Sequence, residues 1–193
     1  MVNGQKMSKS VGNFLTIRDC IDRYGVDATR MALADAGDSL DDSNFDELVA
    51  NSAILRLFIF EKWCQEEIRK NMPAEGLDFS LRPENDLWDN ILENELAYAI
   101  DQTTKDYNEI RYKQALKHGF FELQTLKEDY LIAKGGKMNP FVLLKFIETQ
   151  LILINPICPH FAEYCWEQHV RPLLEKSKNG KAPAQRLINQ GWP

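Results

Sequence analysis

Two lysines three residues apart alternate with two serines near the N-terminus, in the run Lys6-Met7-Ser8-Lys9-Ser10, and Gly12 and Asn13 follow directly. Ammonium groups are compact charges that bind phosphate oxygens, hydroxyl groups add hydrogen-bond donors, and glycine lets the backbone approach a ligand closely. When a carboxylate attacks the α-phosphate of ATP, such cations stabilise charge on the departing pyrophosphate without a general base. The run is therefore a candidate polyphosphate site, and its ordinary alternative is a solvated loop rich in lysine and serine.

Other basic residues form two groups that suit the phosphates of a nucleic acid. The first follows the lysine-serine run and the second comes later in the chain: Arg18, Arg23 and Arg30, then Lys105, Arg111, Lys113 and Lys117. The formal net charge of −6 argues against indiscriminate nucleic-acid binding, so RNA contacts must come from such local patches. Each group is explained equally well as a solvated helix face with acidic partners.

Cysteine, histidine and aspartate also cluster in ways that invite a metal site. Zinc would need the set Cys158, His160, Cys165 and His169, which has no paired CxxC or HxxxH element, so we expect core packing and no bound metal. Calcium would need the acidic run Asp35, Asp38, Asp41 and Asp42, which lacks the spacing of an EF-hand loop. Helix capping explains these aspartates as well.

Glycine, proline and the spacing of apolar residues divide the chain into the elements that must hold these side chains. Residues 1–15 have no regular period and are expected to form a loop. Helices are predicted over 17–24 with Thr16 as N-cap, over 26–36, and from Ser43 or Asn44 as N-cap to about residue 70. A further helix has Pro83 in its first turn and breaks near 106–111, and the next ends at Gly135. Pro140 opens the most apolar helix, 141–154, which should be central, and a last helix begins near 159.

Apolar residues at three- and four-residue spacing predict the buried face of the longer helices. For the third helix these are Phe45, Leu48, Val49, Ser52, Leu55, Phe58, Ile59 and Trp63. For the fourth they are Leu87, Trp88, Ile91, Leu92, Leu96, Ala99 and Ile100. Trp63, Trp88 and Trp166 are read as core residues rather than base-stacking platforms. The expected fold is all-α, an antiparallel helical bundle over 38–193 with an N-terminal loop and short helices over 1–37.

Several motifs resemble one known family over nearly the whole chain. KMSKS at 6–10, followed by Tyr24-Gly25, Asp27 and Arg30, resembles the second signature of class I aminoacyl-tRNA synthetases and the stem-contact region behind it. The segments ALADAGD at 32–38 and DSNF at 42–45 are similar to leucyl-tRNA synthetases of eukaryotic or archaeal type. YKQALK at 112–117, GFFELQ at 119–124 and NPICPHF at 155–161 resemble the anticodon-binding domain of these enzymes.

The resemblance implies a leucine–tRNA ligase, which activates leucine with ATP and Mg²⁺ and transfers it to tRNA(Leu). Carried over by motif, Lys9 would contact the pyrophosphate side of ATP and Lys6 would assist it. Met7, Ser8, Ser10, Gly12 and Asn13 would complete the ATP-binding loop, and the two basic groups would meet tRNA. The family's other signature, HIGH, is absent around all three histidines, so the chain alone is expected to be inactive.

Two alternatives stay open at this point. The bundle could serve alone as a tRNA- or protein-binding module, or the chain could be the same region of an isoleucyl-, valyl- or methionyl-tRNA synthetase. The sequence lacks both an apolar run of the roughly 20 residues that a membrane span needs and a secretory segment. Its four cysteines show no disulfide framework, so a cytoplasmic location is expected. Nothing in the sequence bears on the oligomeric state.

Overall fold

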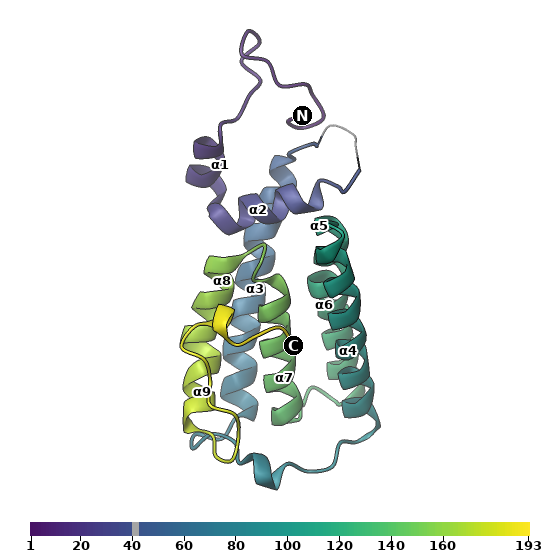
Figure 1. Ribbon diagram of the computed structural model, residues 1–193, viewed down its shortest axis with the longest axis vertical. Coiled ribbons are helices and arrows are strands. Elements are labelled where there is room, and N and C mark those ends of the chain that lie inside the picture. Colours follow the sequence, from purple (N-terminus) through teal and green to yellow (C-terminus); the bar gives the residue numbers. More distant parts are fainter. Residues whose placement is uncertain (40–42) are drawn as a thin grey trace.

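The computed structural model describes residues 1–39 and 43–193, and within them the chain is a helical bundle with a small N-terminal extension (Figure 1). The extension carries α1 (Ile17–Tyr24) and α2 (Val26–Asp35). The bundle contains α3 (Glu47–Asn71), α4 (Leu87–Asn108), the run α5 (Tyr112–Leu116), η2 (Lys117–Phe121) and α6 (Glu122–Ala133), then α7 (Pro140–Ile154) and the run α8 (Pro159–Cys165), η3 (Trp166–Val170) and α9 (Arg171–Lys176). Here η2 and η3 are π-helical turns, whereas η1 (Phe79–Leu81) and η4 (Leu187–Asn189) are 3₁₀ turns. The expected all-α antiparallel bundle is confirmed.

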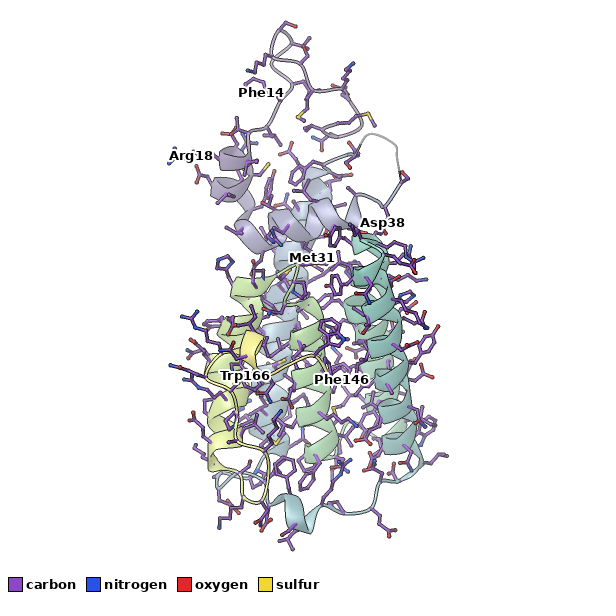
Figure 2. All side chains as sticks on the ribbon, viewed as in Figure 1. Phe14, Arg18, Met31, Asp38, Phe146 and Trp166 are labelled. Atoms are coloured by element: carbon purple, nitrogen blue, oxygen red, sulfur yellow. The ribbon has the colours of Figure 1, made fainter. Side chains whose placement is uncertain are left out.

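Helix α7 lies in the centre of the bundle, as its composition predicts. The Asn139 side chain caps it by accepting a hydrogen bond from the Phe141 amide at 3.1 Å, and Pro140 follows in the first turn. Nearly every residue of α7 is buried, and the helix contacts α3, α4 and α8. Figure 2 shows Phe146 of α7 and Trp166 of η3 inside the bundle, and both are fully buried. None of the described helices combines the length and apolar character that crossing a bilayer requires.

The start of α1 also agrees with the sequence. Thr16 Oγ1 accepts from the Asp19 amide at 3.1 Å, and the Asp19 carboxylate accepts from the Thr16 amide at 2.9 Å. The two bonds complete a capping box. Gly25, with φ of 77°, ends the helix in a conformation that suits glycine. Helix α2 then lies across the end of the bundle, where it contacts α3, α5 and α8 (Figure 1).

The predicted start of α3 is wrong, and its predicted buried face is right only in part. Phe45 is buried, and Val49 and Trp63 are partly buried against the core. Asp46, not Ser43 or Asn44, is the N-cap, and it accepts from the Leu48 amide at 2.8 Å. Four large members of the predicted stripe are exposed, namely Leu48, Leu55, Phe58 and Ile59, and the small Ser52 is exposed with them. The buried side carries Ala50, Ala53, Leu57, Phe60 and Cys64 instead. Helix α3 is apolar on more than one side, and the side with small residues lets neighbouring helices pack closely.

Helix α4 differs from prediction in its first turns. It begins at Leu87 behind the N-cap Asp86, so Pro83 lies in the connector rather than in the helix. Leu92, Leu96 and Ala99 are buried as expected, but Leu87, Trp88 and Ile91 are exposed. The inward position of the first turn belongs to Asp89, which accepts hydrogen bonds from the Tyr130 hydroxyl at 2.6 Å and the Asn139 amide at 2.9 Å. The first turn of α4 thus places the hydrogen-bonded carboxylate of Asp89 in the core, and Trp88 lies on the exposed side.

Candidate functional site

The lysine-serine run forms a tight, exposed turn beyond the end of the bundle. The Ser8 amide donates to the Asn13 carbonyl at 3.0 Å, and the Gly12 amide donates to the Lys9 carbonyl at 3.3 Å. Gly12 has φ of 75°, a left-handed conformation that a side chain would strain. The Ser8 and Ser10 hydroxyls lie 2.8 Å apart, and the side-chain amide of Asn13 donates to the Lys6 carbonyl at 3.4 Å. The backbone is therefore shaped by residues of the run itself.

Lys6 and Lys9 point into solvent from this turn. Both are exposed, and neither makes an ion pair with any residue in the described part of the chain. The positive charge of the turn is thus left free for an external anion. This geometry is compatible with the predicted polyphosphate contact, and the roles assigned to the individual residues stay predictions.

The base of the turn is tied to the start of α3. The Asn3 amide donates to the Phe45 carbonyl at 2.9 Å, and the Asn3 side chain exchanges hydrogen bonds with Glu47 at 2.9 and 3.1 Å. Val2 and Phe45 are both buried. Glu47 also accepts from the Tyr24 hydroxyl of α1, and these two donors lower the pKa of its carboxyl, with Tyr24 the larger cause. Glu47 therefore joins α1, the turn and α3.

A second junction fixes α2 to the loop between α7 and α8 and to the first turn of α8. Arg30 donates from Nε to the Ile157 carbonyl at 2.7 Å and from Nη2 to the Pro156 carbonyl at 2.8 Å. The Asp27 carboxylate accepts from His160 Nδ1 at 3.0 Å and from the Phe161 amide. Two of the five N–H groups of Arg30 are thereby occupied within the protein. A tRNA contact by Arg30 stays a prediction, made with fewer free donors.

The other two arginines of the first basic group differ in their freedom. Arg18 extends from α1 away from the bundle (Figure 2) and has no partner within the described residues. Arg23 lies 3.5 Å from Glu47 in an exposed ion pair. An exposed pair of this kind contributes little stability and can be exchanged for another anion. Both side chains stay candidates for tRNA contact.

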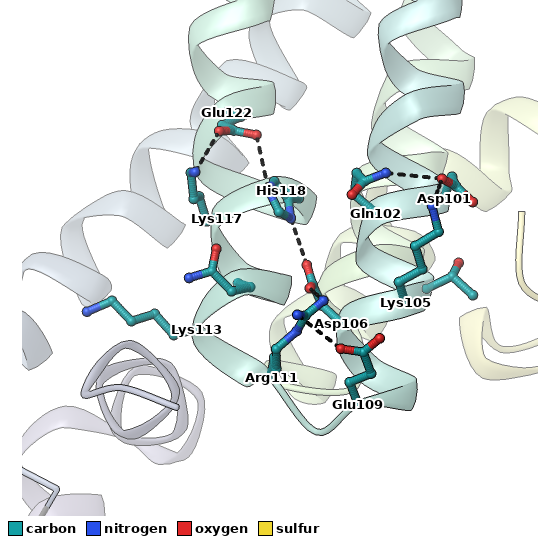
Figure 3. A network of polar contacts seen from close by, with 12 residues as sticks. Asp101, Gln102, Lys105, Asp106, Glu109, Arg111, Lys113, Lys117, His118 and Glu122 are labelled. Carbon is teal, nitrogen blue, oxygen red and sulfur yellow. Dashed lines mark hydrogen bonds and ion pairs between the residues drawn. The ribbon is translucent and has the colours of Figure 1, made fainter. Parts of the chain in front are cut away.

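The second basic group gathers where α4 turns into α5, at the end of the bundle nearest α2 (Figure 3). Each of its members has an acidic partner: Lys105 pairs with Asp101 at 2.6 Å, Arg111 with Asp106 at 2.8 Å, Lys113 with Asp35 at 3.9 Å and Lys117 with Glu122 at 3.5 Å. All four basic side chains remain about half exposed. The structure brings the four basic residues together. It also gives each an acidic partner, as a solvated helix face would.

An open cleft of about 770 Å³ adjoins this basic corner. Its lining includes Tyr107, Tyr112 and Trp192, and it lies between α2, the α4–α5 corner and the C-terminal tail. The Trp192 indole nitrogen donates to Thr104 Oγ1 at 2.7 Å, which holds the ring against Tyr107. Tyr112 and Trp192 are each nearly half exposed. No contiguous motif marks this site, because its lining comes from segments that are far apart in the chain.

The two groups that were weighed as metal sites make separate contacts in the structure. Cys158 and Cys165 are fully buried, whereas His160 pairs with Asp27 and His169 with Glu61. Among the described residues no group of three ligating side chains converges on one point. In the acidic run, Asp38 caps α5 by accepting from the Lys113 amide at 2.9 Å and the Gln114 amide at 3.2 Å. Asp41 and Asp42 lie outside the described residues.

Comparison with known protein families gives two matches. The family described as the anticodon-binding domain of tRNA ligase matches residues 89–193. The family described as tRNA synthetases class I (I, L, M and V) matches residues 2–46, which include the lysine-serine turn. Together the two matches account for most of the chain.

Individual relatives agree with these families. The chain is 41% identical to the cytoplasmic leucine–tRNA ligase of Saccharomyces cerevisiae over 99% of its own length and 17% of that protein. It is 38% identical to the leucine–tRNA ligase of Aeropyrum pernix over 98% of its length and 19% of that protein. The chain thus spans less than a fifth of the length of these relatives.

A solved structure has the same fold. The crystal structure of a ternary complex of Agrobacterium radiobacter K84 agnB2 LeuRS, tRNA and LeuAMS matches 100% of this chain and 23% of that one. The TM-score is 0.68 and the sequence identity is 22%. At this identity the likeness speaks for the fold alone.

Proposed function

This chain belongs to the family of anticodon-binding domains of tRNA ligases, and we propose that it is the part of a leucine–tRNA ligase that joins the ATP site to the tRNA-binding bundle. The parent enzyme activates leucine with ATP and Mg²⁺ and transfers it to tRNA(Leu). Similarity to leucine–tRNA ligases along nearly the whole of this chain supports the choice of leucine over isoleucine, valine and methionine. Several of these relatives are named cytoplasmic, so we place the parent enzyme in the cytoplasm.

The observation that carries the proposal is the exposed turn whose two lysines make no ion pair with the residues that the structure describes. When ATP is bound by the catalytic part of the parent enzyme, Lys9 contacts the pyrophosphate side of the triphosphate and Lys6 assists it. Met7, Ser8, Ser10, Gly12 and Asn13 keep the turn in shape. As pyrophosphate leaves, the two ammonium groups stabilise the charge that builds up on its oxygens. The chain has no HIGH signature, so it forms no adenylate by itself.

Substitution of Lys9 in the full-length enzyme tests this role. Lys9→Ala should slow leucine-dependent pyrophosphate exchange by about 100-fold or more, because it removes a charge used mainly in the transition state. The matched control is Lys137→Ala, an exposed lysine in the turn before α7 at the opposite end of the bundle, which should leave the rate unchanged. Equal rates for wild type and Lys9→Ala would overturn the assignment.

The tRNA part of the proposal rests on the basic groups and the neighbouring cleft. Arg18, Arg23, Lys105, Arg111, Lys113 and Lys117 supply phosphate contacts, with Arg30 a further candidate. Exposed aromatic rings in the cleft beside them offer faces on which RNA bases stack. Because the net charge is −6, tRNA binding must come from local basic patches such as these.

A titration of the chain with a tRNA(Leu) transcript at two salt concentrations tests tRNA binding. Phosphate contacts release counterions, so the dissociation constant should rise about tenfold or more between about 50 and about 200 mM salt. Binding that is absent, or that does not respond to salt, would contradict a phosphate-based interface. Either result would favour a protein partner for the bundle.

A further inference from the structure

A buried carboxylate lies beneath the basic corner. Asp106 is only 2% exposed, although it belongs to the last turns of α4 next to solvent. It accepts hydrogen bonds from Arg111 Nη2 at 2.8 Å and from His118 Nδ1 at 2.7 Å (Figure 3). A buried charge costs free energy unless it is paired and hydrogen-bonded. The Asp106 carboxylate therefore needs both donors.

The backbone holds Arg111 over this carboxylate. Helix α4 ends at Asn108, Ile110 follows with φ of 59°, and the Arg111 amide donates back to the Asp106 carbonyl at 2.8 Å. A β-branched residue rarely adopts this left-handed conformation, so the surrounding contacts must fix the turn. The Asp38 carboxylate then caps the start of α5 directly behind Arg111. The position of the Arg111 side chain is therefore set from both ends.

Two acids contact the same guanidinium from different environments. Asp106 is buried, whereas the Glu109 carboxylate, 3.0 Å from Nη1, has a side chain that is 59% exposed. Arg111 itself is 45% exposed and keeps three of its five N–H groups free of these two contacts. Lys105, Lys113 and Lys117 pair instead with the more exposed acids Asp101, Asp35 and Glu122. Within the described chain, Arg111 is thus the member of this group that a buried acid holds.

We propose that Asp106 is a positioning residue for a tRNA phosphate contact made by Arg111. Asp106 anchors one edge of the guanidinium, and the outward edge meets a backbone phosphate in the forked geometry that arginine favours. Glu109 occupies that outward side in the free protein and gives way to the phosphate. This inference rests on the proposed tRNA binding and adds to it the residue that orients the contact.

The proposal makes the two acids act in opposite directions. Asp106→Asn and Glu109→Gln each remove one negative charge beside Arg111, and general electrostatics alone would strengthen RNA binding in both variants. If Asp106 positions Arg111, Asp106→Asn should instead weaken tRNA(Leu) binding roughly fivefold, the range expected when one long side chain is no longer held in place. Glu109→Gln should strengthen binding, because it removes a competitor of the phosphate.

The experiment is a titration of the chain with a tRNA(Leu) transcript across a salt series. Asp106→Asn should also lower the slope of log affinity against log salt by about one phosphate contact, as Arg111→Met should. Combining the two substitutions should cost no more than Arg111→Met alone. A purely structural role for Asp106 would lower the melting temperature and leave the salt slope unchanged, which would overturn the proposal.

An exposed substitution provides the same test if Asp106→Asn does not fold. Arg111→Lys keeps the charge but loses the fork that Asp106 holds, so it should bind about as weakly as Arg111→Met. Wild-type affinity for Arg111→Lys would show that charge alone matters and would contradict the proposal. If the wild-type chain binds tRNA and Asp106→Asn binds equally well or better, the positioning role fails alone. If the wild-type chain does not bind, the proposed tRNA function itself fails.

Discussion

The residues that organise the candidate site are acids whose partners lie far away in the sequence. Glu47 links Asn3, Tyr24 and Arg23, and Asp27 is bonded to His160 in the first turn of α8. A sequence shows such acids only as isolated charges, because their role depends on which distant donors the fold brings to them. The lysine-serine run could be predicted because its residues are contiguous, and so could the capping box of Thr16 and Asp19.

At the residue scale, Glu47 should make the stability of the chain depend on acid pH. Its carboxyl pKa is lowered in the folded protein by hydrogen bonds from Tyr24 and Asn3, so the unfolded state binds the proton more tightly. The stabilisation is present above the ordinary glutamate pKa and is lost as pH falls through the lower folded value. Because the pair is partly exposed, Glu47→Gln should reduce the free energy of unfolding by only about 0.5 kcal/mol at neutral pH.

Urea unfolding of wild type and Glu47→Gln at pH 7 and at pH 3 measures this difference. The difference between the two proteins should be larger at pH 7 than at pH 3. A difference that persists unchanged at low pH would show that the glutamate acts through packing rather than through its charge.

At the scale of the helices, ends and breaks were predictable where glycine, proline or capping residues mark them. The stops at Gly25 and Gly135 and the start of α7 at Pro140 are examples. The corner at Ile110 was only weakly marked, because it uses isoleucine where a helix end usually has glycine. The buried face of α3 was not predictable from period alone. Large apolar residues lie on its exposed side, and the side that packs against the other helices carries Ala50 and Ala53.

Two phenylalanines on α3 test this assignment of faces. Phe60 is 1% exposed and stacks on Trp63, whereas Phe58 is 57% exposed. Phe60→Ala should lower the free energy of unfolding by about 3–5 kcal/mol, because it leaves a cavity in the core. Phe58→Ala should change it by less than about 0.5 kcal/mol. Denaturant unfolding of both variants decides the matter, and a larger loss for Phe58→Ala would mean that α3 is turned the other way.

At the scale of the whole molecule, the short helices α1 and α2 and the bundle share one core. Buried residues of α1 and α2, among them Tyr24 and Met31, belong to the same core as α3 and α7. Hydrogen bonds of Glu47, Arg30 and Asp27 add polar links between the N-terminal extension and the bundle. The division at residue 37 stays a prediction based on the sequence. This core joins the helices that follow the lysine-serine turn to the bundle that carries the second basic group.

The activity of the full-length parent tests the account most directly. Aminoacylation of tRNA(Leu) should be measured with leucine, isoleucine, valine and methionine in turn, for wild type and for Lys9→Ala. We expect efficient charging by wild type with leucine alone, and a loss of about 100-fold or more in Lys9→Ala. Charging with one of the other three amino acids in place of leucine, or full activity of Lys9→Ala, would contradict it.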